Sequence, residues 1–360
     1  MKFPAIFLSV LLFAQVPIAF AMETDQYNLP PVPLADIGDE VTQYVADNIE
    51  EAIKRLNAQI ALHQGCLDAP AAKDTRCGSV EHESQKLAYL RSNDALAKEV
   101  FLPLGDGNIF VSKSGQWMNS HRFSHSPERY KAEYTESIYI AELIDYATLS
   151  PTVRLYGVEF GTDKIDHMFQ QGYKYYRLYR DAVRGGRTPE EAQKQAVKWG
   201  QMTERTYYGL LVSGVYSNAD LAANFAGLRF YQGLSQPLEI NGKTRPAMLA
   251  LHNGRWECAS NVDRNETLLK PLLSDHLNEA LNPSGYTALL YPFVLSAVKD
   301  KSCPKWRKAY PQLNAVDLGK QSQSLERWNN EDYGFAQSTR MVRLAGLCFG
   351  DEKQQIVTTK

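Results

Sequence analysis

The stretch 159–227 constrains the fold most, because apolar sequence of helical spacing is interrupted there by acids, amides and a histidine. Asp163 and His167 stand four residues apart, and so do Asp220 and Asn224. Four-residue spacing places each pair on one face of a helix. These side chains are too polar for a simple apolar core, so they predict a polar site between the helices of a bundle.

Helical patterns cover most of the chain. Thr188-Pro189 begins one helix, which carries Glu204, and Ser217 precedes another. Asn241-Gly242 and Asn253-Gly254 are hairpin-turn signals. The sequence therefore predicts a mainly α fold, a helical bundle with a small antiparallel β element in its C-terminal part. Further helices are expected near residues 39–62, 79–101, 127–148, 163–183, 220–231, 266–282 and 287–299, a short hairpin or strand pair at 108–115, and a soft domain boundary between 22–235 and 236–360.

Residues 1–21 have the form of a secretory signal peptide. Lys2 precedes an apolar run to Phe20, and Ala19-Phe20-Ala21 predicts cleavage after Ala21. The alternative, a membrane anchor, is disfavoured because the run of about 15 residues is shorter than the ~20 that span a bilayer. We therefore expect a periplasmic or secreted protein without a transmembrane span in the mature chain.

Charge and cysteine content fit this expectation. The formal net charge is −2 and no long basic block occurs, which argues against nucleic acid as a partner. Export favours disulfides, and Cys66 and Cys77 are expected to pair across a short loop. Cys258 is expected to pair with Cys303 and to leave Cys348 free, although spacing does not choose among these three.

The polar stretch suggests two kinds of chemistry. Asp163, His167 and Glu204 are suitable ligands for a divalent metal such as zinc, which would activate a bound water. Without a metal, Glu204, Asp220 and His167 are candidate catalytic acid–base groups. Asn224 would complete or orient the site.

Other residues are candidates for binding. Glu159 lies four residues before Asp163, so a helix that began early would carry both on one stripe with His167. Tyr173 belongs to a stretch rich in Tyr and Arg, with Arg177 and Arg180, that is typical of contacts with glycans, peptides or lipid headgroups, although core packing explains half of it equally well. Glycines near these side chains would allow close helix approach, namely Gly161, Gly200 and Gly227.

Each polar residue also has a purely structural interpretation. Asp163 suits the first turn of a helix, His167 a satisfied core position and Asp220 a capping box. A buried polar network can fix helix packing without any chemistry. His121 and His125 also stand four apart, but Pro127 follows at once, which favours loop histidines over a zinc site.

The motifs Asp163-Lys-Ile-Asp-His167 and Asp220-Leu-Ala-Ala-Asn224-Phe-Ala-Gly227, with a Glu-bearing helix between them, resemble bacterial envelope families of unknown function. These include VanZ-like membrane proteins and small periplasmic lipoproteins. The resemblance covers about 70 residues and implies a helical protein tied to the cell envelope, but no reaction. The charged residues Lys174, Arg177, Arg180 and Asp181 depart from the membrane-embedded members.

Two functions follow as hypotheses. The first is an exported envelope protein with an interhelical Asp/His/Glu site that acts as a metal-assisted hydrolase on an envelope component. The alternative is a non-enzymatic periplasmic binding or scaffold protein in which the same residues form a structural network.

Overall fold

The computed structural model describes residues 23–69, 76–108, 111–259 and 263–350. Within them the protein is mainly α-helical, as predicted, with four small two-stranded antiparallel sheets. The expected signal peptide and its cleavage site at Ala21 lie outside the described residues. None of the helices in the described ranges is long and apolar enough to cross a bilayer.

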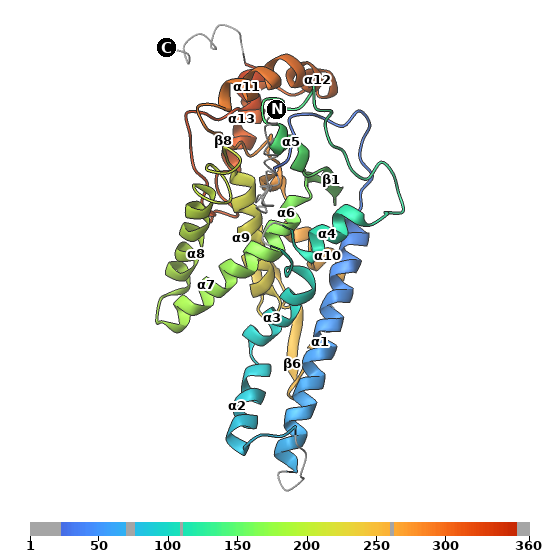
Figure 1. Ribbon diagram of the computed structural model, residues 1–360, viewed down its shortest axis with the longest axis vertical. Helices are drawn as coiled ribbons and strands as arrows, with labels where there is room; N and C mark the ends of the chain where they lie inside the picture. The colour runs from blue at the N-terminus through green and yellow to red at the C-terminus, as the bar shows by residue number, and fades with distance from the viewer. Residues whose placement is uncertain (1–22, 70–75, 109–110, 260–262, 351–360) are drawn as a thin grey trace, which may run out of the picture.

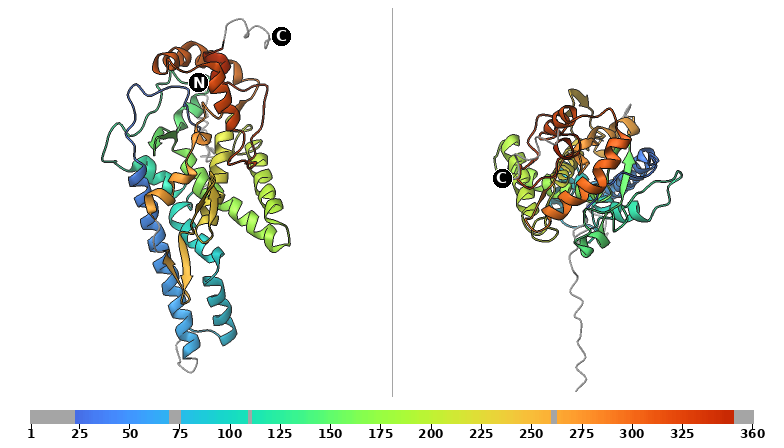
Figure 2. Two further views of the ribbon diagram at one scale, coloured as in Figure 1. Left: turned by 180° about the vertical axis from the view of Figure 1, so that it is seen from behind. Right: turned by 90° about the horizontal axis from the view of Figure 1, so that it is seen from above.

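A long helical arm forms one end of the molecule (Figures 1 and 2). Helix α1 (Gly38–Asp68) has buried Val, Ile and Leu side chains at helical spacing, which pack against α2 (Val80–Leu90) and α3 (Asn93–Leu104). The Cys66–Cys77 disulfide forms as predicted and joins α1 to the segment just before α2. The single helix predicted over 79–101 is two helices, because Ser92 caps a new one by accepting from the Ala95 N–H.

The centre of the molecule is built on α9 (Asn218–Gly233). Every residue of α9 except Arg229 is buried. It packs against α8 (Pro189–Glu204) and against a continuous helix made of α6 (Asp163–Asp166), a π-helical turn η1 (His167–Gln171) and α7 (Gly172–Arg184). Polar side chains on α9 are therefore forced into the interior.

Turn residues set the strand pairs. The predicted hairpins form at Asn241-Gly242 and Asn253-Gly254, where all four residues have positive φ. A third hairpin, β1–β2, was not predicted; it turns at Tyr156-Gly157.

Glu159 lies in this hairpin rather than on a helix, so the predicted stripe with Asp163 and His167 is wrong. The pairs are β1 (Thr152–Leu155) with β2 (Val158–Gly161), β3 (Val215–Tyr216) with β8 (Gly285–Tyr286), β4 (Leu238–Ile240) with β5 (Lys243–Arg245), and β6 (Leu249–His252) with β7 (Arg255–Cys258).

Three further predicted elements are wrong or shorter than expected. The segment 127–148 is helical only in α5 (Leu143–Thr148), because the Ile138 N–H donates to the Asp25 carboxylate instead of to a helix carbonyl. Helix α4 (Lys113–Ser120) replaces part of the expected hairpin at 108–115, and residues 109–110 lie outside the described part. The segment 266–282 has only α10 (Arg264–Thr267) and two 3-10 turns, since Pro271 interrupts it.

The C-terminal helices form the opposite end of the molecule (Figure 2). They pack around a second hydrophobic cluster that contains Cys303 and Cys348. These two cysteines are joined, so the expected Cys258–Cys303 pair is wrong, and Cys258 is free and exposed at the end of β7. The main core includes residues from both sides of position 235, and the domain boundary there stays a prediction. These helices are α11 (Tyr291–Ala297), the π turn η4 (Val298–Ser302), α12 (Cys303–Ala309), α13 (Ala315–Ser324) and α14 (Leu344–Cys348).

Candidate functional site

Four of the predicted residues meet where α6 and η1 cross α9. Asp163 and His167 approach from one side, and Asp220 and Asn224 from the other. Ser217 caps α9 by accepting from the Asp220 N–H, as its sequence indicated. The four-residue spacing therefore did place each pair on a shared face.

A lysine that sequence reasoning missed lies at the centre of this group. Lys164 is completely buried, and its Nζ is 2.6 Å from Asp163 Oδ2, 2.6 Å from Asp220 Oδ1 and 2.7 Å from Glu279 Oε1. Burial lowers the pKa of this ammonium, but the three carboxylates outweigh burial and hold the pKa well above its ordinary value. We call Asp163, Lys164, Asp220 and Glu279 the lysine cluster.

Hydroxyl groups complete the shell around these carboxylates. Thr24 Oγ1 donates to Asp163 Oδ1 at 2.7 Å. Ser217 Oγ and Ser284 Oγ donate to the two oxygens of Glu279 at 2.8 and 2.6 Å. A buried charge is tolerated only when it is paired and hydrogen-bonded, and this cluster meets both conditions.

His167 is held by two acceptors. Its Nε2 lies 3.2 Å from Asp220 Oδ2 and its Nδ1 lies 3.0 Å from Asn224 Oδ1. Burial lowers the pKa of the imidazole, but the Asp220 carboxylate reverses this effect and raises the pKa to about 9. An imidazolium that donates from both nitrogens has no lone pair for a metal. With 16% of its side chain exposed, His167 connects the cluster to solvent.

Glu204 approaches from the end of α8 and is almost fully buried. Burial and then the charge of Asp220 raise the pKa of its carboxyl to about 8, so it is protonated near neutral pH. Its Oε2 accepts from the Ser217 N–H at 3.3 Å, and in the described part of the chain its Oε1 has no hydrogen-bond partner. Glu204 therefore holds a proton beside the His167–Asp220 pair.

The predicted metal ligands Asp163, His167 and Glu204 are not gathered as one ligand set. Among the described residues, the set whose ligand atoms lie within 4.8 Å of one another is Asp163, Asp220 and Glu279. The Lys164 ammonium already occupies the position between these carboxylates, so a divalent ion would have to displace it.

The predicted binding residues lie in different parts of the molecule. Asn224 contacts His167, whereas Glu159 lines one cavity and Tyr173 another. His121 stacks on Trp117 at 4.4 Å between ring centroids, and its Nε2 lies 3.7 Å from Glu40 Oε2, which is a packing role. Sequence reasoning also missed Glu23, a buried acid that accepts from Ser213 Oγ at 2.7 Å.

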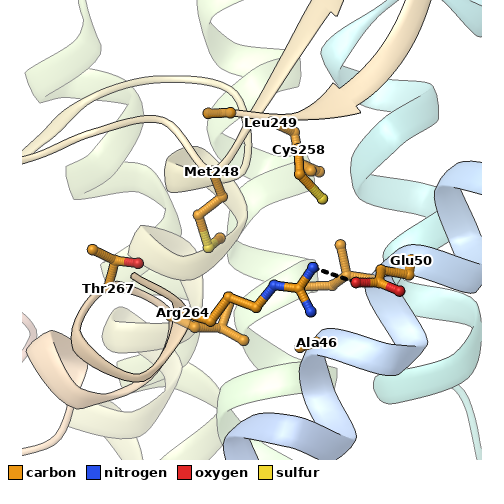
Figure 3. A pocket seen from close by; sticks show the side chains of 10 residues that line it. Ala46, Glu50, Met248, Leu249, Cys258, Arg264 and Thr267 are labelled. Atoms are coloured by element: carbon orange, nitrogen blue, oxygen red, sulfur yellow. Dashed lines mark ion pairs between the residues drawn. The ribbon is translucent and has the colours of Figure 1, made fainter. Parts of the chain in front are cut away.

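A third, small cavity of about 150 Å³ lies between α1, the β6–β7 hairpin and α10 (Figure 3). The ion pair between Arg264 and Glu50 borders it, beside the free Cys258. Its lining is mostly apolar and includes no member of the lysine cluster.

The two raised pKa values predict that stability falls as the pH rises from about 6.5 to 9. Glu204 has a folded-state pKa of about 8 against 4.5, and His167 one of about 9 against 6.5. In this window the folded state binds more protons than the unfolded state, so the free energy of unfolding decreases, by about 2 kcal/mol for each of the two groups. Urea unfolding at several pH values measures the decrease.

Glu204→Gln should make this pH dependence shallower because it removes one of the two groups. Glu190→Gln, a change of the same type at an exposed position of α8, should leave the slope unchanged. A free energy of unfolding that is constant or rises between pH 6.5 and 9 would contradict the protonation states assigned to the site.

Comparison of the chain with protein-family models, curated proteins and solved structures gave no match.

Proposed function

We propose that this is an exported, non-catalytic binding protein in which the lysine cluster is a structural network and the ligand pocket lies beside it. Two disulfides are compatible with an oxidising compartment outside the cytoplasm. One observation supports a structural role. Lys164 is fully buried, and each of the three carboxylates around it forms an ion pair with its ammonium. No ligand group in the cluster is left for a substrate.

The pocket has about 380 Å³ and is lined by Glu159 and Arg154 of the β1–β2 hairpin. Arg154 Nε lies 4.0 Å from Asp36 Oδ2 and makes no hydrogen bond in the described part of the chain. Burial raises the pKa of Glu159, and the charge of Arg154 opposes that rise. A guanidinium and a carboxylate therefore face one cavity with unused hydrogen-bonding capacity.

The lysine cluster supports the floor of this pocket. Gln26 accepts from the Glu279 N–H at 2.8 Å and donates to the Glu159 carbonyl at 2.9 Å. Asn278 donates to the same carbonyl at 3.0 Å. Because Glu279 also binds Lys164, a rigid cluster fixes the position of the strand that carries Glu159.

The lining indicates the class of ligand. Arg154 suits a carboxylate, Glu159 suits an amine, and Tyr310, Leu281 and Leu313 provide an apolar wall. A free amino acid or a short peptide with an apolar side chain carries these three features. We therefore propose a zwitterionic ligand of this kind, available as a component or product of the cell envelope.

Calorimetric titration with a dipeptide such as alanyl-leucine tests the proposal. Saturable binding is expected, and Arg154→Gln or Glu159→Gln should each weaken it about ten-fold or more, as loss of a charge-assisted hydrogen bond does. Arg187→Gln and Glu190→Gln, at exposed positions outside the pocket, serve as controls. Absence of binding, or equal weakening by the control variants, would overturn the proposal.

A hydrolase is the second candidate, and one observation favours it. Glu204 is a suitable general acid because its pKa is about 8. His167 is a suitable second acid–base group because part of its side chain is exposed to solvent. Elemental analysis of dialysed protein tests the metal-dependent form of this candidate. Near-stoichiometric metal that is lost in Asp220→Asn would support a metal-assisted hydrolase and contradict a purely structural cluster.

A further inference from the structure

The structure contains another cavity, between α3, the end of α2 and α7, with a volume of about 460 Å³. It shares no lining residue with the lysine cluster or with the pocket beside Glu159. Its size is within the range of pockets that enclose small ligands. We call it the α3–α7 cleft.

Positive charge dominates the α3–α7 cleft. Asp94, at the start of α3, forms ion pairs with both Arg180 and Arg184 of α7. Arg177 and Lys98 also line the cleft, and within the described ranges neither side chain makes an ion pair or a hydrogen bond. Four cations and two acids, Asp94 and Asp181, therefore leave two positive charges in excess (4 − 2 = 2).

Aromatic rings form the remaining wall. Phe101 stacks on Tyr173 with 4.2 Å between ring centroids, which fixes the Tyr173 ring in the cleft. Tyr89 is 43% exposed and lines the cleft as well. Burial raises the pKa of Tyr173 to about 12, so its hydroxyl stays a neutral hydrogen-bond donor.

An anionic group bound to Arg177 and Lys98 would lie beside these rings. A sugar presents apolar C–H faces to an aromatic ring and hydroxyl groups to neighbouring polar side chains. Arginine binds a planar carboxylate with two parallel hydrogen bonds. One molecule that combines both features is a sugar that carries a carboxylate.

We infer that the α3–α7 cleft binds an acidic sugar unit, such as a residue of a uronic-acid polymer. This inference does not rest on the proposed peptide pocket, because the two cavities have different lining residues and their ligands have different net charges. In the cleft the ligand must be anionic, whereas the pocket beside Glu159 takes a zwitterion.

Titration of the full protein with tetragalacturonate tests the inference, with neutral maltotetraose as the matched ligand control. Saturable binding of tetragalacturonate alone is expected. The double variant Lys98→Gln/Arg177→Gln should weaken it about ten-fold or more, because two charge-assisted contacts are lost. Neither side chain is part of an ion pair in the described part of the chain, so the fold should be retained, which a thermal melt checks.

Lys194→Gln/Lys198→Gln is the matched control, since it removes two exposed charges from α8, outside the cleft. Tyr89→Phe should retain the affinity and Tyr89→Ala should lower it, because the ring and not its hydroxyl forms the wall. The inference is overturned if tetragalacturonate does not saturate at millimolar concentration, if maltotetraose binds equally well, or if the α8 double variant weakens binding as much. Arg154→Gln, which addresses the other pocket, should leave this titration unchanged.

Discussion

Replacing Lys164 by methionine is expected to lower the free energy of unfolding by about 3–5 kcal/mol, the range for breaking a buried ion pair from one side. Lys164 is fully buried and binds Asp163, Asp220 and Glu279 within 2.7 Å. Methionine fills a similar volume but leaves three carboxylates close together in the interior, and the His167 imidazolium beside Asp220 is the remaining counter-charge. Urea unfolding monitored by circular dichroism measures the loss.

Two further variants make this result specific. Lys194→Met, at an exposed position of α8, should change stability by no more than about 0.5 kcal/mol. Adding Asp163→Asn and Glu279→Gln to Lys164→Met should recover part of the loss, because two of the stranded carboxylates become neutral. If Lys164→Met were as stable as the parent protein, the lysine cluster would not be a structural element.

Gly227→Ala is expected to have the second largest effect, a loss of about 3 kcal/mol or more. A Cβ at Gly227 would lie 2.0 Å from the Met168 carbonyl oxygen and 2.7 Å from the Gly172 Cα. These are backbone atoms of the helix that carries His167, so relief requires α7 and α9 to move apart. The same movement would separate His167 from Asn224, which is 3.0 Å away.

Gly319→Ala is the matched control for this prediction. Gly319 lies in α13, and an added Cβ there would meet no atom within 4 Å. Alanine has the higher helix propensity, so this variant should gain up to about 1 kcal/mol. Thermal melts of both variants test whether Gly227→Ala lowers the stability and Gly319→Ala raises it. An equal, small effect of the two substitutions would contradict the close approach of α7 and α9.

Local sequence patterns predicted the elements that local interactions stabilise. The helix start at Thr188-Pro189, the Ser217 cap and the two Asn-Gly turns depend on residues within five positions of one another, and the structure confirms each. The predicted helix over 127–148 fails for the opposite reason. Its Ile138 N–H donates to Asp25, more than a hundred residues earlier in the chain, and no local pattern reports such a partner.

In the candidate site, too, local spacing predicted some residues, and the tertiary fold brought in others. Spacing of four residues correctly placed Asp163 and His167 on one helix face and Asp220 and Asn224 on another, and the two faces meet through His167. Lys164 was missed because a lysine beside an aspartate is ordinarily exposed, and only its position within apolar sequence could have indicated burial. Glu279 has no local signal, since it lies in an irregular segment and meets Lys164 only through the tertiary fold.

The segment that follows Glu23 contacts both the centre of the molecule and its C-terminal part. Thr24 donates to Asp163 in the main core, whereas the Tyr27 hydroxyl donates to the Val342 carbonyl and the Trp306 indole donates to the Tyr27 carbonyl. Contacts between residues so far apart in the sequence, 315 for Tyr27 and Val342, form slowly, because a long loop must close before they contribute. During synthesis Tyr27 leaves the ribosome long before Trp306 and Val342, so its partners become available only near the end of translation.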